Sequence, residues 1–239
     1  MERNALRTLW SECFGNEDGW IDAFFQTAFR PEQVQVLTRQ GQLAAALSWM
    51  DVSCQGKKLA YLYAIATAPA FRGQGLCRGL MEKTHGELIR RNYAGAILVP
   101  ADAGLRRMYA RMGYRGFSGS RLLSAQAGVP VAIWQLSPEE YADARRTCLP
   151  AGGVVQEAGA PDYLGTTARL YAGEDFLLAM SPEGFGVELL GNTDAAPGIL
   201  GALGISEGTF RTPGEEPFAM YHSLTEDTWT PGYFGLAFD

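Results

Sequence analysis

Cysteine and histidine are scarce in this sequence. Its 239 residues include four cysteines and two histidines. No two cysteines have C-x-x-C spacing, and the histidines do not complete a recognisable set of zinc ligands. We therefore expect reduced thiols and no bound metal. The residues concerned are Cys13, Cys54, Cys77, Cys148, His85 and His222.

Long apolar runs are also missing. No stretch approaches the roughly 18 apolar residues that span a bilayer. The first 13 residues lack the basic start and apolar run of a secretion signal. Apolar residues still make up 47% of the chain and charged residues 19%, which is the balance of a folded protein. We expect a cytoplasmic protein that does not associate with membranes.

Basic residues are few in the second half of the chain. Residues 1–125 hold 16 Lys and Arg against 10 Asp and Glu, a net charge of +6. Residues 126–239 hold 4 against 16, a net charge of −12. Such a chain is not expected to wrap nucleic acid, because only one half can neutralise phosphates. The basic half suits a phosphorylated cofactor, and the acidic half suits either a cationic substrate or simple solvation.

The first half alternates helical and extended patterns. Apolar spacing predicts helices over residues 5–15 and 19–29, then three strands separated by turns at Gln40-Gly41 and Gln55-Gly56. These strands form an antiparallel meander. A helix, a short buried strand, a second helix and an extended segment follow. The predicted strands are 34–40, 43–54 and 59–67, and the later elements are 75–91, 94–100, 103–113 and 114–117.

The second half repeats part of this order. Ser137 and the acidic residues after it are typical of a helix start. The predicted elements are helices over 137–148, 161–173 and 196–204, a hairpin over 175–191 that turns at residues 182–184, and a strand over 214–224. We predict two domains, residues 1–124 and 131–239, joined near residues 126–130. The fold class is α/β (α+β), with a mixed, mostly antiparallel sheet flanked by helices, plus a second, smaller α+β domain.

The segment Arg72-Gly73-Gln74-Gly75-Leu76-Cys77-Arg78 has the form of an anion-binding loop. A glycine loop between a strand and a helix lets backbone N–H groups converge on a phosphate, and the helix start adds partial positive charge. The sequence lacks the G-K-[ST] of a nucleoside triphosphate loop. It also lacks the G-x-G-x-x-G and distal acidic residue of a dinucleotide site.

Several separated segments resemble the GCN5-related N-acetyltransferase (GNAT) superfamily. They occur in the family's order and spacing and cover about residues 5–120. The resemblance implies the GNAT fold and a transfer of an acetyl group from acetyl-CoA to a primary amine by direct attack in a ternary complex. The lack of a matching loop in the second half implies a degenerate GNAT-like second domain. The matching pieces are YLYAIAT, APAF, RGQGLCRGLM, AILVP and MYARMGYRGF.

The resemblance also assigns roles to residues. Backbone groups of Ile65, Ala66 and Thr67 would bind the acetyl carbonyl and the pantetheine arm. Backbone groups of residues 72–78 would hold the pyrophosphate of the CoA. Tyr109 matches the family's tyrosine and would be the general acid for the departing thiolate; the alternative is a core aromatic at a helix end. The acceptor is then a small-molecule or peptide amine, of cationic character if the acidic half attracts it, and the oligomeric state is left open.

Other residues leave alternatives open. Asp102 stands where many relatives have asparagine, and either repels a phosphate or binds the amine. Cys77 is either packing or a thiol of lowered pKa. Tyr61 and Tyr63 share one strand face and either line an acceptor pocket or pack the sheet. The candidates for general base are Glu12, Asp51, Glu82 and Asp102.

The tandem arrangement and the loop pattern R-x-x-G-L-x-R-x-L-M also resemble the enhanced intracellular survival type of aminoglycoside acetyltransferase. In that group the chain terminus folds back into the active site. The resemblance therefore adds the carboxylate of Asp239 to the candidates for general base. An alternative of a different class is a non-catalytic module that senses acyl-CoA and engages a protein partner.

Overall fold

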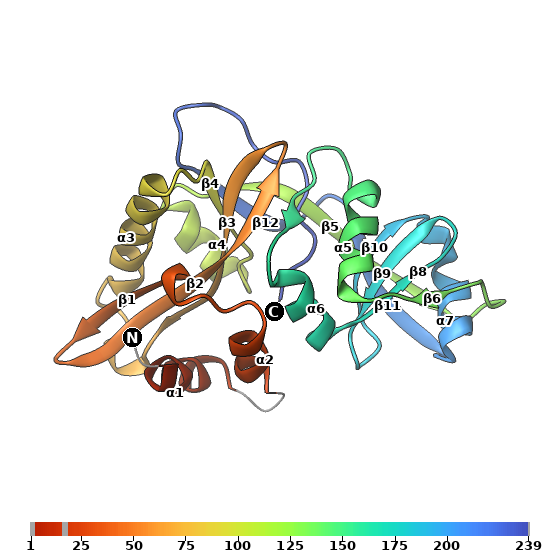
Figure 1. Cartoon of the computed structure of the whole chain (residues 1–239), viewed down its shortest axis with the longest axis horizontal. Helices are drawn as coiled ribbons and strands as arrows, with labels where there is room; N and C mark the ends of the chain where they lie inside the picture. Colours follow the sequence, from red (N-terminus) through yellow and green to blue (C-terminus); the bar gives the residue numbers. More distant parts are fainter. Residues whose placement is uncertain (1–2, 16–18, 239) are drawn as a thin grey trace.

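A computed structural model describes residues 3–15 and 19–238. The chain forms two lobes joined by one continuous mixed sheet (Figure 1). The strand order is β1-β2-β3-β4-β12-β5-β11-β10-β9-β8-β6, and β7 pairs with β2. Most neighbouring strands are antiparallel, and helices flank the sheet, as predicted from the sequence. Within the described residues no helix is long and apolar enough to cross a membrane.

The elements of the first half follow the predicted order. Gln40 and Gly41 have φ of 53° and 76°, and Gln55 and Gly56 have φ of 50° and 76°. Two successive residues of positive φ match the right-handed twist of the adjoining strands, and so close both hairpins of the predicted meander. The elements are α1 (Arg3–Phe14), α2 (Trp20–Gln26), β1 (Val34–Arg39), β2 (Gln42–Cys54), β3 (Lys57–Thr67), α3 (Leu76–Arg90), β4 (Gly95–Leu98) and α4 (Ala103–Ala110).

The second half contains more strands than the sequence predicts. Ser137 and Glu140 form a reciprocal capping box at the start of α5, as expected. The predicted hairpin is confirmed as β9 and β10. The elements are β6 (Trp134–Gln135), α5 (Pro138–Cys148), β7 (Val155–Gln156), α6 (Ala160–Thr167), β8 (Arg169–Ala172), β9 (Phe176–Met180), β10 (Gly186–Gly191), α7 (Ala196–Leu203), β11 (Glu207–Pro213) and β12 (Glu216–Ser223).

The prediction of one helix over residues 161–173 is wrong in its second part. The helix ends at Thr167, and Arg169–Ala172 form β8, which pairs with β9. Leu170 and Tyr171 are buried there. A segment this short has no periodicity that separates a helix end from a buried strand, so the pairing partner decides its conformation.

The two halves exchange their last strands. β5 (Arg115–Gln126) leaves the first lobe and pairs antiparallel with β11 of the second along its carboxy-terminal part. In return, β12 pairs antiparallel with β4 and with the start of β5. The strand predicted over 214–224 therefore exists, but it completes the sheet of the first lobe. In the sheet β4 lies between this strand and β3.

The order of elements is the same in the two lobes. In the first lobe, β3 leads through α3 to β4, which is parallel to it. In the second, β10 leads through α7 to β11, again parallel. Two helices and two antiparallel strands precede each of these units. This repeat supports our proposal that the second half is a degenerate copy of the first fold.

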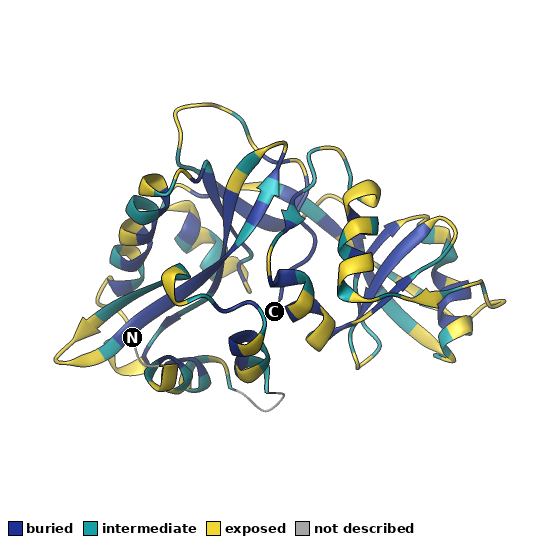
Figure 2. Ribbon diagram, viewed as in Figure 1, coloured by how far each residue is buried: buried dark blue, intermediate teal, exposed yellow. Residues whose placement is uncertain are grey.

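Three apolar clusters form the core, and Figure 2 shows their residues as the buried interior of both lobes. One lies under α3 and α4, on one face of the first lobe's sheet. The largest lies on the opposite face, where α1, α2, α6 and the carboxy-terminal segment meet between the lobes. The third lies under α7. The sheet thus separates the α3 side from the side where the lobes meet.

Two histidines join the exchanged strand to α3. The rings of His85 on α3 and His222 on β12 stack with centroids 4.4 Å apart and an interplanar angle of 13°. Nε2 of His85 is 2.8 Å from the hydroxyl of Tyr114. Burial, and secondarily the neighbouring His222, lower the pKa of His85 from 6.5 to about 4. The native state therefore holds this imidazole neutral.

This arrangement predicts a loss of stability in acid. Between pH 6.5 and about 4 the unfolded chain binds a proton at His85 that the native state does not, so the free energy of unfolding falls as pH decreases. The contribution has an upper bound of about 1.4 kcal/mol per pH unit. Urea titrations at pH 7.5, 6.0 and 5.0 should show a shallower pH dependence for His85→Gln than for the wild type. Equal slopes would contradict the assignment.

Candidate functional site

A bulge interrupts β3 close to its end. Ala46 pairs with Ala66 and Ser48 pairs with Tyr63, so the single residue between them on β2 faces both Ala64 and Ile65. Ala64 has a φ of 51°, and its carbonyl accepts a hydrogen bond of 3.0 Å from Nε1 of Trp10 on α1. A bulge bends a strand and re-aims its backbone groups. The indole of Trp10 thus fixes the bend in place.

The parallel pairing of β3 with β4 stops before this bulge. The register runs from Leu59 opposite Gly95 to Tyr61 opposite Ile97, and β4 ends at Leu98. In the described structure no strand pairs with residues 62–67 on the side away from β2. The predicted acetyl-binding residues lie here, with Ile65 and Thr67 half-buried and Ala66 buried. The carbonyl of Thr67 already accepts hydrogen bonds from Arg72 and Cys13, whereas no strand covers the residues before it on this side.

The glycine loop follows directly. A short 3-10 turn (Pro69–Phe71) leads into residues 72–75, and α3 begins at Leu76. Gly73 and Gly75 both have φ of 75°, and Gly75 caps the helix with no side-chain hydrogen bond. The first N–H groups of a helix lack intrahelical partners. Because no side chain caps them here, they and the helix dipole are open to an anion, as the sequence predicts.

Side chains of the loop divide into an exposed and a packed set. Arg72, Gly73, Gln74, Gly75 and Arg78 are exposed, Leu76 is buried and Cys77 is half-buried. Nε of Arg72 donates to the carbonyl of Thr67 at 3.1 Å, and the same guanidinium lies 3.7 Å from Sγ of Cys13. Arg72 therefore ties the loop to the end of β3 and to α1.

Tyr109 lies in the last turn of α4, on the α3 side of the sheet. Its side chain is 6% exposed and packs in the same cluster as Leu76, Cys77 and Ile65. Among the described residues the Tyr109 hydroxyl has no hydrogen-bond partner. Every fully buried side-chain oxygen in the described residues does have a partner, so this hydroxyl is not fully buried. The hydroxyl consequently reaches solvent. Burial, with a smaller contribution from Cys77, raises the pKa of Tyr109, so the phenol remains protonated and able to donate.

Two residues that left alternatives open have structural roles. Oδ1 of Asp102 accepts a hydrogen bond of 2.7 Å from the backbone N–H of Leu105 and so caps α4. Burial raises the pKa of the Cys77 thiol, which is the opposite of the lowered pKa that a reactive thiolate needs. Cys77 acts as packing beside Tyr109.

The remaining candidates are distributed over both faces of the sheet. Tyr61 and Tyr63 are buried on the side where the lobes meet. Asp51 accepts hydrogen bonds from Tyr93 and Gln33. Glu12 and Glu82 are exposed. Asp239 lies outside the described residues. No group of three or more His, Cys, Asp or Glu side chains within residues 3–15 and 19–238 is placed to hold a metal ion.

Substitution of Gly75 tests the conformation of the loop. An added Cβ would meet nothing within 4 Å, so Gly75→Ala introduces only the cost of a positive φ. We expect it to lower the free energy of unfolding by about 1 kcal/mol. Gly116→Ala is the matched control, because that site is also open but its φ is not positive. Urea denaturation should separate the two variants, and equal midpoints would show that the loop is not held in this conformation.

Similar structures cover almost the whole chain. A GCN5-related N-acetyltransferase from Anabaena variabilis has a TM-score of 0.68 and 15% identity, over 94% of this chain and 71% of that one. Eis1 from Mycobacterium abscessus has a TM-score of 0.68 and 14% identity, over 94% and 72%. A GCN5-related N-acetyltransferase from Kribbella flavida has a TM-score of 0.65 and 16% identity, over 94% and 71%. At these identities the likeness is one of fold.

No curated protein sequence matches this chain. A family model does: residues 2–116 match the model described as an acetyltransferase (GNAT) domain. The matched residues include the bulged strand, the glycine loop, α3 and α4. Residues 2–116 are therefore a GNAT acetyltransferase domain.

Proposed function

We propose that the chain is an N-acetyltransferase that moves an acetyl group from acetyl-CoA to a primary amine. One observation carries the proposal. The unpaired end of β3, the uncapped start of α3 and Tyr109 lie on the same side of the sheet, since Ile65, Cys77 and Tyr109 belong to one apolar cluster. These are the groups that bind a thioester and its phosphates and that protonate a thiolate.

Backbone groups account for the binding of acetyl-CoA. The N–H groups of residues 72–78 at the start of α3 would hold the pyrophosphate, with the exposed Arg78 adding full positive charge. Ile65, Ala66 and Thr67 would bind the acetyl carbonyl and the pantetheine arm along the open side of β3. Backbone donors fixed by a bulge need no reorganisation during the reaction, which is the condition for effective stabilisation of an oxyanion.

Both the attack on the thioester and the departure of the thiolate are assisted by groups of this arrangement. A neutral amine attacks the thioester carbon, and the carbonyl oxygen becomes an oxyanion that an N–H near Ile65 stabilises. The C–S bond then breaks. The thiolate takes the proton of the Tyr109 hydroxyl, and the proton lost by the amine restores the phenol through solvent. Positioning the amine beside the thioester supplies much of the acceleration.

The charge of the second half supports a cationic acceptor. Residues 126–239 have a net charge of −12 and residues 1–125 have a net charge of +6, so a positively charged amine is attracted to the second half of the chain. A polyamine, an aminoglycoside or a lysine-containing peptide would fit this field. The attraction is screened by salt, because exposed charges interact over roughly 8–10 Å at physiological ionic strength.

Release of free CoA from acetyl-CoA tests the function directly. Spermidine, kanamycin and a lysine-containing peptide serve as cationic acceptors, with glycine amide as a small acceptor of lower charge. We expect CoA release with at least one cationic amine, and a rise in its KM as NaCl increases from 50 to 500 mM. Binding of acetyl-CoA without release of CoA for any amine would favour the acyl-CoA sensor instead.

Tyr109→Phe tests the proposed acid. The variant keeps the ring and its packing but removes the transferable proton. We expect kcat to fall by about 100-fold or more, with the Kd for acetyl-CoA unchanged. Tyr171→Phe, at a buried tyrosine under α7, is the control and should keep full activity. If Tyr109→Phe retained wild-type kcat, the assigned role would be excluded.

A further inference from the structure

The carboxy-terminal segment, residues 233–238, lies between the lobes. All six of its residues, from Tyr233 to Phe238, are buried. Oγ of Ser118 on β5 both donates to the carbonyl of Phe234 and accepts from its N–H, each at 2.9 Å. The backbone N–H of Val154 donates to the carbonyl of Tyr233 at 2.8 Å. The segment is therefore fixed by parts of both halves.

One end of the segment is bound to a buried ion pair. Nε and Nη2 of Arg145 on α5 donate to the two carboxylate oxygens of Glu188 on β10, at 2.6 and 2.9 Å. The side chains are 4% and 0% exposed. The Tyr233 hydroxyl donates to Glu188 Oε1 at 3.1 Å, and the Tyr141 hydroxyl lies 3.5 Å from Oε2. Buried ion pairs of this kind contribute little net stability compared with apolar packing, so their function is more often to fix geometry.

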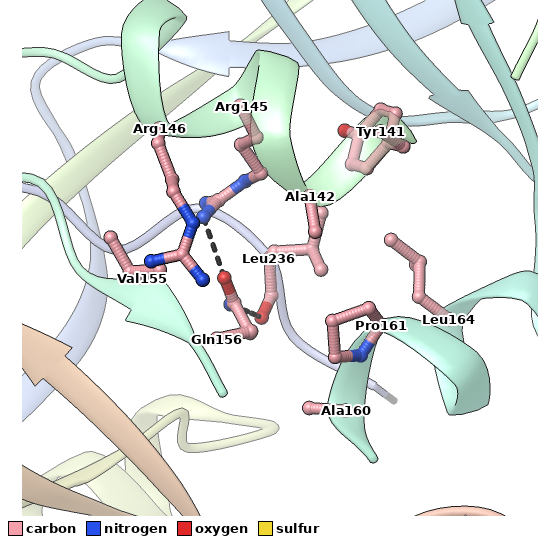
Figure 3. Close-up of a pocket in the computed structure, with 10 residues that line it drawn as sticks. All are labelled: Tyr141, Ala142, Arg145, Arg146, Val155, Gln156, Ala160, Pro161, Leu164 and Leu236. Carbon is pink, nitrogen blue, oxygen red and sulfur yellow. Dashed lines mark hydrogen bonds between the residues drawn. The ribbon is translucent and has the colours of Figure 1, made fainter. Parts of the chain in front are cut away.

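A second contact passes through Gln156. Nη1 of Arg145 donates to Oε1 of Gln156 at 2.5 Å, and Nε2 of Gln156 donates to the carbonyl of Leu236 at 3.4 Å (Figure 3). These groups line a crevice between α5, α6, β7 and the segment, with about 10 Å³ of interior space. That is the volume of about one water molecule, which is too small for a ligand. The crevice is a closely packed contact.

The other end of the segment reaches β3. The Phe238 ring lies 6.0 Å from Tyr61, 6.5 Å from Tyr63 and 5.2 Å from Tyr163, between centroids. Its N–H donates to the Tyr61 hydroxyl at 3.4 Å. Tyr63 immediately precedes the bulge at Ala64 and Ile65. The segment thus connects Glu188 in the second lobe to the strand that would bind the acetyl group.

We propose that Glu188 is a positioning residue, which holds residues 233–238 against β3 so that they form a wall of the amine-acceptor site. This inference rests on the proposed acetyl transfer and gives the second lobe a role in it. Glu188 does not touch either substrate. It acts through Tyr233 and, by way of Arg145 and Gln156, through Leu236. Displacement of the segment would then impair the acceptor and leave acetyl-CoA binding intact.

Tyr233→Phe is the sharpest test, because it removes one hydrogen bond to Glu188 and leaves the ion pair with Arg145 in place. We expect the acceptor KM, measured with spermidine, kanamycin and the lysine-containing peptide, to rise by about tenfold. The KM for acetyl-CoA should not change. Amide hydrogen exchange within residues 233–238 should accelerate by a similar factor. Tyr221→Phe is the matched control, since it removes a 3.2 Å bond from a buried tyrosine to the carbonyl of Ala94.

Phe238→Ala perturbs the opposite end of the segment and should raise the acceptor KM without altering the ion pair. Faster exchange of the segment in Tyr233→Phe with unchanged acceptor KM would overturn the positioning role. Unchanged amide hydrogen exchange of residues 233–238 in Tyr233→Phe would also overturn it. If the wild-type protein transferred acetyl to no amine, the proposed function itself would be overturned. If the wild type were active and the variant equally active, only the positioning role would be overturned.

Discussion

The exchange of strands β5 and β12 between the lobes is the constraint on which the rest of the structure depends. In each lobe a parallel pair of strands, β3–β4 or β10–β11, is followed by an antiparallel strand that the other lobe supplies. Neither sheet can therefore be completed by its own half of the chain. The half that contains the glycine loop and the acidic half form one continuous sheet, and the carboxy-terminal segment lies between the lobes.

The candidate site lies where the pairing of β3 with β4 ends before β3 itself does. The parallel ladder between β3 and β4 stops at Tyr61, and the bulge at Ala64 turns the strand beyond it. In the described structure no strand covers residues 62–67 on the side away from β2, although Arg72 and Cys13 occupy the carbonyl of Thr67. The uncapped start of α3 lies at the end of the following loop. In the proposed function, binding of a thioester and of phosphates would depend mainly on backbone geometry. Side chains such as Trp10 and Arg72 fix that geometry from outside.

Local features of the fold could be predicted from the sequence, because short-range chemistry determines them. The Gln-Gly pairs at 40–41 and 55–56 adopt the positive φ that a tight hairpin needs, and Ser137 with Glu140 forms the expected capping box. The glycine loop and Tyr109 were identified through spacing that resembles a family. Tyr109, Ile65 and Cys77 belong to one apolar cluster, and the roles of these residues stay predictions.

Long-range pairings could not be predicted. The residues of β12 indicate a strand, but nothing in them indicates that β4 is its partner. β8 is a four-residue strand after a helix, and β11 (EGTFRTP) has a single large apolar residue, so neither has a distinctive period that would have predicted it. The bulge in β3 depends on a one-residue mismatch between two strands, and the contacts of Glu188 with Tyr233 join residues 45 positions apart. Such features are properties of the assembled sheet.

The most direct test of the account is a map of amide chemical-shift changes on titration of the wild-type protein with acetyl-CoA. Binding at the proposed site predicts the largest changes at Gly73, Gly75 and Leu76, with further changes at Ile65 and Thr67. The corresponding turn of the second lobe, at residues 192–198, should not respond. Saturable binding with changes centred on residues 192–198, and none at the loop, would contradict the assignment of the site.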